Sequence, residues 1–278
     1  MNPAVLAKRA EVIRAVREFF WSLDFIEVET PVRIPAPAME PHIIAPESGD
    51  QWLRTSPELH MKRLVSDGAS RVFQIGPCFR EGEKGRRHNP EFTLLEWYRA
   101  YAGLEEILQD TESLVSQILG IREPFARIAV EEAYLKWAGW DPLVNWDADR
   151  FDLDMVNVIE PNLPKTPCFL IGYPREAAAL ARISRSDPRA AERAELYVGG
   201  LEIANGYGEL RDPVEQRKRF EEARQARIAL GQPVYPMDED FLKSLERFPP
   251  SGGIALGLDR LVMLACGVND IAEIRPFC

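Results

Sequence analysis

The stretch that decides the fold is residues 79–99, which read Phe-Arg-Glu-Gly-Glu-Lys-Gly-Arg-Arg-His-Asn-Pro-Glu-Phe-Thr-Leu-Leu-Glu-Trp-Tyr-Arg. The apolar run at 72–75 predicts a strand that ends at Arg80, and a strongly charged loop over 81–88 follows it. The chain then predicts a returning strand whose alternate residues share one face: Phe92, Leu94, Glu96 and Tyr98. The sequence therefore predicts a long antiparallel hairpin with an arginine and a basic loop at its tip.

The chemistry of this hairpin favours a polyphosphate ligand. A guanidinium group can grip phosphate oxygens with two parallel hydrogen bonds, so Arg80 beside a basic loop is suited to that task. On the returning strand, Phe92 can stack on a base and Glu96 can hold an amine. An isolated basic loop would usually be no more than a solvated turn, so the rest of the chain has to support this interpretation.

Composition limits the class of protein. The chain has 278 residues, of which 46% are hydrophobic and 28% charged, as expected for a globular protein rather than a disordered one. Its net charge of −10 argues mildly against a nucleic-acid substrate, because such surfaces concentrate Lys and Arg. No apolar run approaches the roughly 20 residues that span a bilayer, so we expect no membrane contact.

The termini and cysteines predict a cytoplasmic protein. Lys8 and Arg9 interrupt the apolar pattern near the N-terminus, which is unlike a secretory signal. The four cysteines, Cys78, Cys168, Cys266 and Cys278, are scattered without zinc spacing. We therefore expect neither structural disulfides nor zinc, as in a reducing compartment.

The order of predicted elements indicates the fold class. Apolar spacing and capping signals predict helices over 5–23, 57–65, 103–120, 213–230 and 258–266. Strands are expected at 25–28, 52–54, 168–171, 194–198 and 252–257. Residues 121–165 are the least informative, and Trp137, Trp140 and Trp146 are expected to be packing residues. This order predicts an α+β fold, with an antiparallel sheet flanked by helices.

Three segments together resemble the class II aminoacyl-tRNA synthetases. Residues 79–99 resemble motif 2 of that family, and 88–93 are similar to its lysyl branch in particular. The helix, strand and Pro31 over residues 5–31 resemble motif 1, and Gly257-Leu258-Asp259-Arg260 resembles motif 3. The resemblance covers nearly the whole chain, and it implies an ATP-dependent enzyme that forms an aminoacyl-adenylate.

The resemblance implies roles for the residues around ATP. Arg80 would hold the α-phosphate, His88 with the loop arginines would reach the β- and γ-phosphates, and Arg260 would meet the γ-phosphate of a bent ATP. These two arginines are the predicted catalytic residues, and Phe92 would stack on adenine. The further predicted ATP-binding residues are Glu81, Gly82, Asn89, Glu202, Ile203 and Gly257.

Two carboxylates are predicted to hold Mg²⁺, a hard cation that bridges phosphate oxygens. Glu195 and Glu202 lie seven residues apart, and an odd spacing places residues on opposite faces of a regular strand. We therefore expect a bulge or bend at Gly199-Gly200 if both face one site. Paired strand carboxylates more often form surface ion pairs, but the string over 202–209 resembles the lysyl-type site closely.

The resemblance also implies an acidic pocket for the amino acid. Glu58 and Glu96 are candidates for one amine, with Ser56 and Pro57 nearby, whereas Tyr98, Asn205 and Glu209 are candidates for the distal ammonium. Ala255 stands where lysyl-tRNA synthetases carry glycine, and residues 35–41 replace their Gly-Gly loop. Both changes fall where a switch from α-lysine to (R)-β-lysine would need them.

Within the family, the chain resembles a truncated paralogue of lysyl-tRNA synthetase. Motif 1 begins at the N-terminus, so we expect a single catalytic domain over residues 1–278 and no anticodon-binding domain. This resemblance implies transfer of (R)-β-lysine to a lysine side chain of elongation factor P instead of to tRNA. Motif 1 further implies a homodimer.

One departure and two alternatives remain. Family motif 2 has Arg-x-Glu, but Gly82 occupies the glutamate position, so either Glu81 or Glu83 could contact adenine, or the contact could be main-chain only. The chain could instead be a synthetase core that acylates tRNA with lysine. It could also be a regulatory paralogue without catalysis, although Arg80, Glu195, Glu202 and Arg260 are all present.

Overall fold

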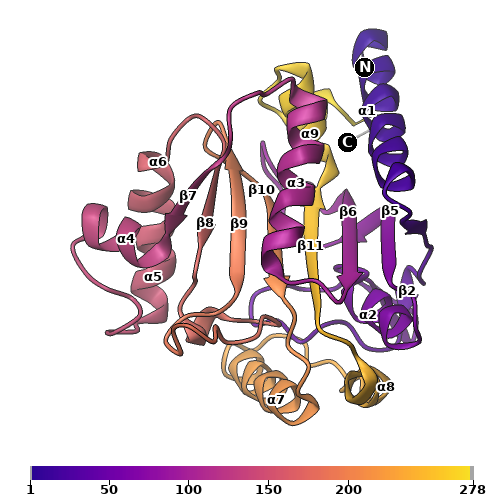
Figure 1. Ribbon diagram of the computed structural model, residues 1–278. Helices are drawn as coiled ribbons and strands as arrows, with labels where there is room; N and C mark the ends of the chain where they lie inside the picture. The colour runs from indigo at the N-terminus through magenta and orange to yellow at the C-terminus, as the bar shows by residue number, and fades with distance from the viewer. Residues whose placement is uncertain (1, 276–278) are drawn as a thin grey trace.

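A single large sheet organises the protein, as seen in a computed structural model that describes residues 2–275 (Figure 1). The eight strands run in the order β1-β5-β6-β11-β10-β9-β8-β7. Their bounds are β1 Ile26–Glu27, β5 Arg71–Phe79, β6 Glu91–Ala100, β11 Ser251–Gly257, β10 Leu201–Gly208, β9 Arg193–Val198, β8 Cys168–Ile171 and β7 Ala126–Ala129. The interior pairs are antiparallel, which confirms the predicted α+β class.

The two edges of the sheet differ from the expectation. β1 pairs parallel with β5, and β7 pairs parallel with β8. A parallel pair needs a long crossover, and each edge strand is separated from its partner by other elements. The sequence therefore could not reveal that these two short strands form the edges of the sheet and run parallel to their neighbours.

Three helices cover one face of the sheet. They are α1 Pro3–Ser22, α3 Leu104–Leu119 and α9 Leu258–Cys266, and Figure 1 shows α3 in front of the sheet beside β11, with α9 at the upper end of that strand. Asn2 caps α1 by accepting a hydrogen bond from the amide of Ala4, with Pro3 in the first turn. The fully buried rings of Phe20 and Phe73 stack at 4.7 Å between α1 and β5, so this face carries the main core.

Smaller elements gather at the end of the sheet where α7 and α8 lie (Figure 1). They are α2 Glu58–Ser66, α7 Pro213–Ala229, α8 Glu239–Ser244 and a three-stranded sheet of β2 Arg33–Ile34, β4 Gln51–Leu53 and β3 Glu47–Ser48. Asp212 caps α7 by accepting from the amides of Val214 and Glu215, as its sequence predicts. Ser56 accepts from the amide of Glu58 at the start of α2. Several predicted helices are thus confirmed within one or two residues.

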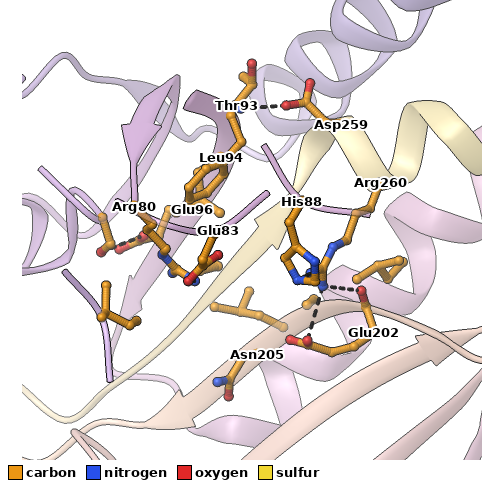
Figure 2. A pocket seen from close by; sticks show the side chains of 18 of the residues that line it. Arg80, Glu83, His88, Thr93, Leu94, Glu96, Glu202, Asn205, Asp259 and Arg260 are labelled. Carbon is orange, nitrogen blue, oxygen red and sulfur yellow. Dashed lines mark hydrogen bonds and ion pairs between the residues drawn. The ribbon is translucent and has the colours of Figure 1, made fainter. Parts of the chain in front are cut away.

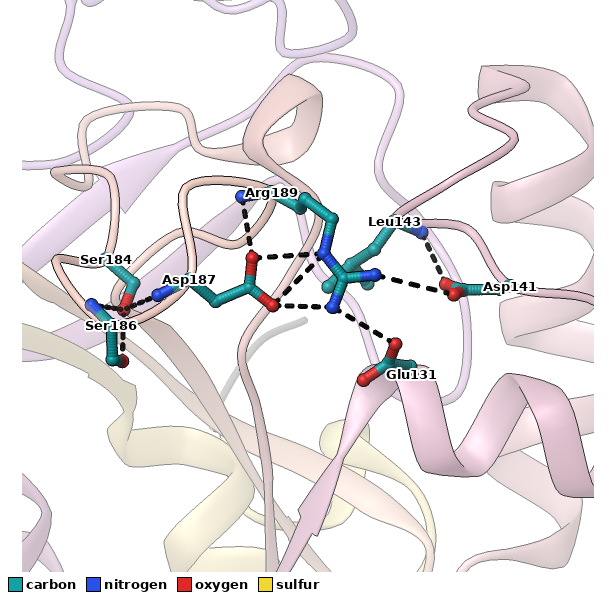
Figure 3. A network of polar contacts seen from close by, with 7 residues as sticks. All are labelled: Glu131, Asp141, Leu143, Ser184, Ser186, Asp187 and Arg189. Carbon is teal, nitrogen blue, oxygen red and sulfur yellow. Dashed lines mark hydrogen bonds and ion pairs between the residues drawn. The ribbon is translucent and has the colours of Figure 1, made fainter.

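Residues 126–165 form a separate layer on β7 and β8. Its helices are α4 Val130–Ala133, α5 Ala148–Asp154 and α6 Glu160–Asn162, with π-helical turns at Tyr134–Ala138 and Met155–Ile159. The three tryptophans pack within this cluster, as expected. Arg189 ties the loop before β9 to this layer, because it pairs with Asp187, Glu131 and Asp141 (Figure 3). The side chain of Arg189 is 43% exposed, so the network adds little stability.

Two features of the described residues concern membrane-spanning helices and cysteines. No helix within residues 2–275 is long and apolar enough to cross a membrane. Cys78, Cys168 and Cys266 are free thiols, and Cys278 lies outside the described residues.

Candidate active site

Strand register brings the predicted site residues to one face of the sheet. Ala255 of β11 lies opposite Glu96 of β6 and Asn205 of β10, and Asn205 in turn lies opposite Glu195 of β9. Directly paired residues point to the same side of a sheet, so four segments distant in sequence share one surface. This surface is the one turned away from α3 and α9.

The two predicted metal ligands reach this surface by a turn and a bulge. Gly199 and Gly200, both with left-handed backbone, reverse the chain between β9 and β10, so the expected bend is a hairpin turn. The register then shifts between Glu202 and Ala204. That extra residue, near Ile203, brings Glu202 onto the same face as Asn205 despite their odd spacing.

This surface lines a cavity of about 610 Å³, a size typical of small-molecule sites. Most predicted site residues line it: Ser56, Glu58, Arg80, Gly82, His88, Asn89, Phe92, Glu96, Tyr98, Glu195, Glu202, Ile203, Asn205, Ala255, Gly257 and Arg260. Pro57, Glu81 and Glu209 do not. Pro57 precedes α2, and Glu81 is exposed, so Glu83 is the acid beside Arg80 that faces the cavity.

Arg80 presents free hydrogen-bonding capacity to this cavity. Its guanidinium lies over the ring of Phe92 at 5.1 Å and 3.8 Å from Glu83. Its Nε is buried and has no hydrogen-bond partner. A buried donor without a partner is costly, so this end of the cavity is prepared for an anion. Gly82, at φ +80°, turns the loop directly after Arg80 in a conformation that favours glycine.

Arg260 lies across the cavity from Arg80, between His88 and Glu202 (Figure 2). Its Nη1 donates to the backbone oxygen of Glu202 at 2.7 Å, and its Nη2 is 2.7 Å from Nε2 of His88. Arginine can only donate, so this His88 nitrogen accepts. Burial and the charge of Arg260 lower the pKa of His88, which keeps the imidazole neutral in the absence of an anion.

Asp259 fixes the start of α9 beside Arg260. It is 2% exposed and accepts from Arg9 of α1 at 2.7 Å, from the Thr93 amide at 2.8 Å and from Arg275 at 3.1 Å. These contacts join α1, β6 and α9 at one carboxylate. The neighbouring arginine is therefore held by three elements rather than by its own helix alone.

Glu195 and Glu202 provide a pair of carboxylates between the arginines and Asn205. Glu195 accepts from the hydroxyls of Tyr173 at 2.5 Å and Tyr197 at 2.9 Å, and from Arg193 at 2.7 Å. Burial, and then the charge of Glu195, raises the pKa of Glu202. Two crowded carboxylates, each with lone pairs left, fit a hard cation. Within residues 2–275, no group of three such ligands occurs, so phosphate oxygens and water would have to complete its shell.

The other end of the cavity is acidic and contains a buried lysine. Lys62 of α2, 1% exposed, lies 2.5 Å from Glu58 and 2.6 Å from Glu209. Burial alone would lower the pKa of Lys62, but the two carboxylates outweigh it and raise this pKa. The buried Oδ1 of Asn205 has no hydrogen-bond donor, so it has unused capacity for a cationic ligand.

Burial perturbs the carboxyl groups of this acidic end. It raises the pKa of Glu96 to about 8, helped by the charge of Glu58. It raises the pKa of Glu209 to about 7, although Lys62 opposes the shift. Glu96 meanwhile accepts from Tyr98 at 2.7 Å and from Ser56 at 3.3 Å. In such a pocket we expect the carboxyl groups to be neutral when no ligand is bound and ionised when a cationic ligand is bound.

Gly253 and Ala255 shape the floor of this end. A methyl group on Gly253 would lie 2.2 Å from the Tyr98 ring and 2.6 Å from Glu209 Oε1. Glycine at this position therefore leaves room for the side chains of Tyr98 and Glu209, which both approach the backbone there. Ala255, one alternation along β11, places a methyl group on the cavity wall itself.

The sequence interpretation missed several residues of the site. Lys62 and Arg193 were not predicted, and Glu40 was covered only as part of the segment over residues 35–41. The i,i+4 spacing of Glu58 and Lys62 on a predicted helix was a usable signal. The alternation of Arg193 with Glu195 was another. Glu40 lies in a stretch without regular structure, and its segment, residues 35–41, is the one expected near the amine of the substrate.

Comparisons with known proteins agree with this geometry. The family model described as "tRNA synthetases class II (D, K and N)" matches residues 2–278. The chain is 37% identical to a protein of Proteus mirabilis over 309 residues, which cover 99% of this chain and 94% of the relative. It is also 37% identical, with the same coverage, to a protein of Photorhabdus laumondii. Both relatives are named elongation factor P–(R)-β-lysine ligase. The chain therefore belongs to the class II tRNA synthetases of the D, K and N group.

Proposed function

We propose that this protein is an ATP-dependent ligase that activates (R)-β-lysine as an aminoacyl-adenylate and transfers it to a lysine side chain of elongation factor P. The name of the relatives supports this substrate and this acceptor, because they share 37% of their residues with the chain over nearly its full length. The α+β class II fold supports the use of ATP.

The observation that carries the proposal is the polarity of the cavity. One end has the buried Nε of Arg80, which has no hydrogen-bond partner, and the other has the carboxylates of Glu58 and Glu96 and the buried Oδ1 of Asn205, which has no donor. An ω-ammonium carboxylic acid matches this arrangement, since its carboxylate faces the cationic end and its ammonium the acidic end. Unpaired buried groups cost free energy, so a substrate that satisfies both ends is selected.

The reaction needs positioning and charge neutralisation more than it needs a nucleophile. The substrate carboxylate attacks the α-phosphorus of ATP in line, the bond from that phosphorus to the bridging oxygen breaks, and pyrophosphate leaves. Arg80 would hold the α-phosphate and Arg260 the γ-phosphate, where negative charge develops. Phe92 would stack on the adenine ring. A Mg²⁺ ion bound to Glu195 and Glu202 would supply additional charge neutralisation at the phosphates.

The acceptor and assembly complete the proposal. The amine of the acceptor lysine attacks the adenylate carbonyl, which forms an amide and releases AMP. The acidic balance of the chain supports a protein acceptor over tRNA. Exposed Trp21 and Ile26 on α1 and β1 support a homodimer through that edge, and the free thiols support a cytoplasmic location. Residues 1–278 would act as one catalytic domain.

ATP–pyrophosphate exchange across a panel of amino acids tests this function. We expect exchange with (R)-β-lysine to exceed that with α-lysine by at least about tenfold in kcat/KM, because the pocket changes near the carboxylate fit a displaced amine. Labelled (R)-β-lysine should then appear on elongation factor P and not on bulk tRNA. Equal exchange with both lysines, or acylation of tRNA alone, would contradict the proposal.

Binding of the amino acid should depend on pH. A carboxyl group is neutral below its pKa, and only its ionised form pairs well with an ammonium group. Since the pKa values of Glu96 and Glu209 are raised, to about 8 and about 7, binding must expel protons from them below those values. We expect KM for the amino acid to fall from about pH 6 to about pH 8.5, with about one to two protons released per ligand at about pH 6.5. Calorimetry in two buffers of different ionisation enthalpy measures that number, and no release would contradict it.

A further inference from the structure

Glu40 differs from the other carboxylates that face the cavity. Each of the others has a partner: Glu58 pairs with Lys62, Glu83 with Arg80, Glu96 with Tyr98, Glu195 with Arg193, Glu202 with Arg260 and Asp259 with Arg9. Among the cavity-lining acids within residues 2–275, Glu40 alone accepts no hydrogen bond and has no cation within 4.0 Å. A partly buried carboxylate left in this state has full capacity for a ligand.

Hydrogen bonds from a buried arginine fix the backbone around Glu40. Arg227 of α7 is fully buried, and its Nη1 donates to the backbone oxygens of Glu40 at 2.6 Å and Ile43 at 2.7 Å. Its Nη2 donates to the Tyr235 hydroxyl, which accepts from the Ala45 amide as well. An irregular loop is therefore fixed by one buried guanidinium, as expected for a segment that positions a functional side chain.

The same loop lies beside the predicted α-phosphate arginine. The amide of Glu81, the residue after Arg80, donates to the backbone oxygen of Ile44 at 2.8 Å. Burial raises the pKa of Glu40, and the positive charge of Arg80 opposes this shift. Glu40 and Arg80 both line the cavity, and the hydrogen bond between Glu81 and Ile44 joins the two loops that carry them.

We propose that Glu40 is a specificity-determining residue that binds the ammonium group nearest the substrate carboxylate. This inference rests on the proposed function and refines it. The substrate carboxylate must approach the α-phosphate at Arg80, so an amine one or two carbons away falls next to Glu40. Glu58 is already paired with Lys62, and Glu96 already accepts from two hydroxyl groups. Glu40 is the cavity carboxylate that has neither kind of partner.

The test pairs one protein change with one ligand change. The ligands are (R)-β-lysine and 6-aminohexanoate, which lacks only the amine near the carboxylate. For wild type and Glu40→Gln, kcat/KM is measured by ATP–pyrophosphate exchange for (R)-β-lysine, and the competitive Ki is measured for 6-aminohexanoate. We expect Glu40→Gln to lower kcat/KM for (R)-β-lysine by about 10- to 100-fold and to change the Ki by less than about twofold.

The matched control is Glu47→Gln, an exposed glutamate on the strand that follows the same loop, which should leave both constants unchanged. Equal weakening of the binding of both ligands would mean that Glu40 acts through Arg80. No effect on either ligand would mean that Glu40 does not contact the substrate. Each of these results overturns the inference. Failure of wild type to exchange with any diamino acid would instead overturn the proposed function, and with it the basis for Glu40.

Discussion

Replacing Arg260 by alanine should lower adenylate formation by about 10³-fold, the loss typical of a single arginine that neutralises transferring phosphate. Arg260 enters the cavity from the first turn of α9 and touches His88 and Glu202. Without it, the γ-phosphate would lose a fork of donors, and Glu202 would lose its counter-charge. ATP–pyrophosphate exchange with (R)-β-lysine measures the effect.

The effect should be on chemistry more than on stability. The Arg260 side chain is 19% exposed and leaves no core cavity when removed, so the melting temperature should change by no more than about 4 °C. Arg224→Ala, on the exposed face of α7, is the matched control and should retain full exchange. If Arg260→Ala kept its exchange rate within about threefold, the roles given to this end of the cavity would be wrong. Arg260→Lys, which keeps the charge but loses the fork, should recover only part of the loss.

Local patterns were sufficient to predict the central hairpin and the start of α9. The alternation of Glu96 and Tyr98 fixes which face they share, and a two-residue period leaves no freedom in that assignment. Capping residues such as Asp212 likewise set helix starts within a residue. Most predicted cavity residues lie on these regular elements, which explains why they are found together.

What the sequence could not reveal depends on contacts between distant segments. The shift of register between Glu202 and Ala204 is a property of the β9–β10 pair, and no local signal marks it. The place of Glu40 is set by Arg227, nearly two hundred residues later in the chain. Lys62 has the periodicity of an ordinary helical residue, and only tertiary packing shows that it is buried between two carboxylates.

Replacing Lys62 by methionine should lower the free energy of unfolding by about 3–5 kcal/mol, because it leaves Glu58 and Glu209 buried without their shared cation. For a chain of this size, that corresponds to a fall in melting temperature of about 10 °C. The pKa of Glu209 should rise further, since Lys62 is the charge that opposes the effect of burial. The KM for the amino acid should rise with it, most strongly at low pH. Thermal unfolding and the pH profile of KM measure the two effects.

A second substitution separates a charge effect from a packing effect. In Lys62→Met/Glu209→Gln the more deeply buried of the two unpaired carboxylates is gone, so about half or more of the lost stability should return. The KM should remain high because the distal acceptor is neutral. If Lys62 only filled space, the double variant would be no more stable than the single one. The matched control is Lys218→Met, which removes the lysine of the exposed i,i+4 pair with Glu222. It should lower the free energy of unfolding by less than about 0.5 kcal/mol. The Glu58–Lys62 and Lys218–Glu222 pairs share the same i,i+4 spacing, so the contrast between them isolates burial as the cause of the larger loss of stability.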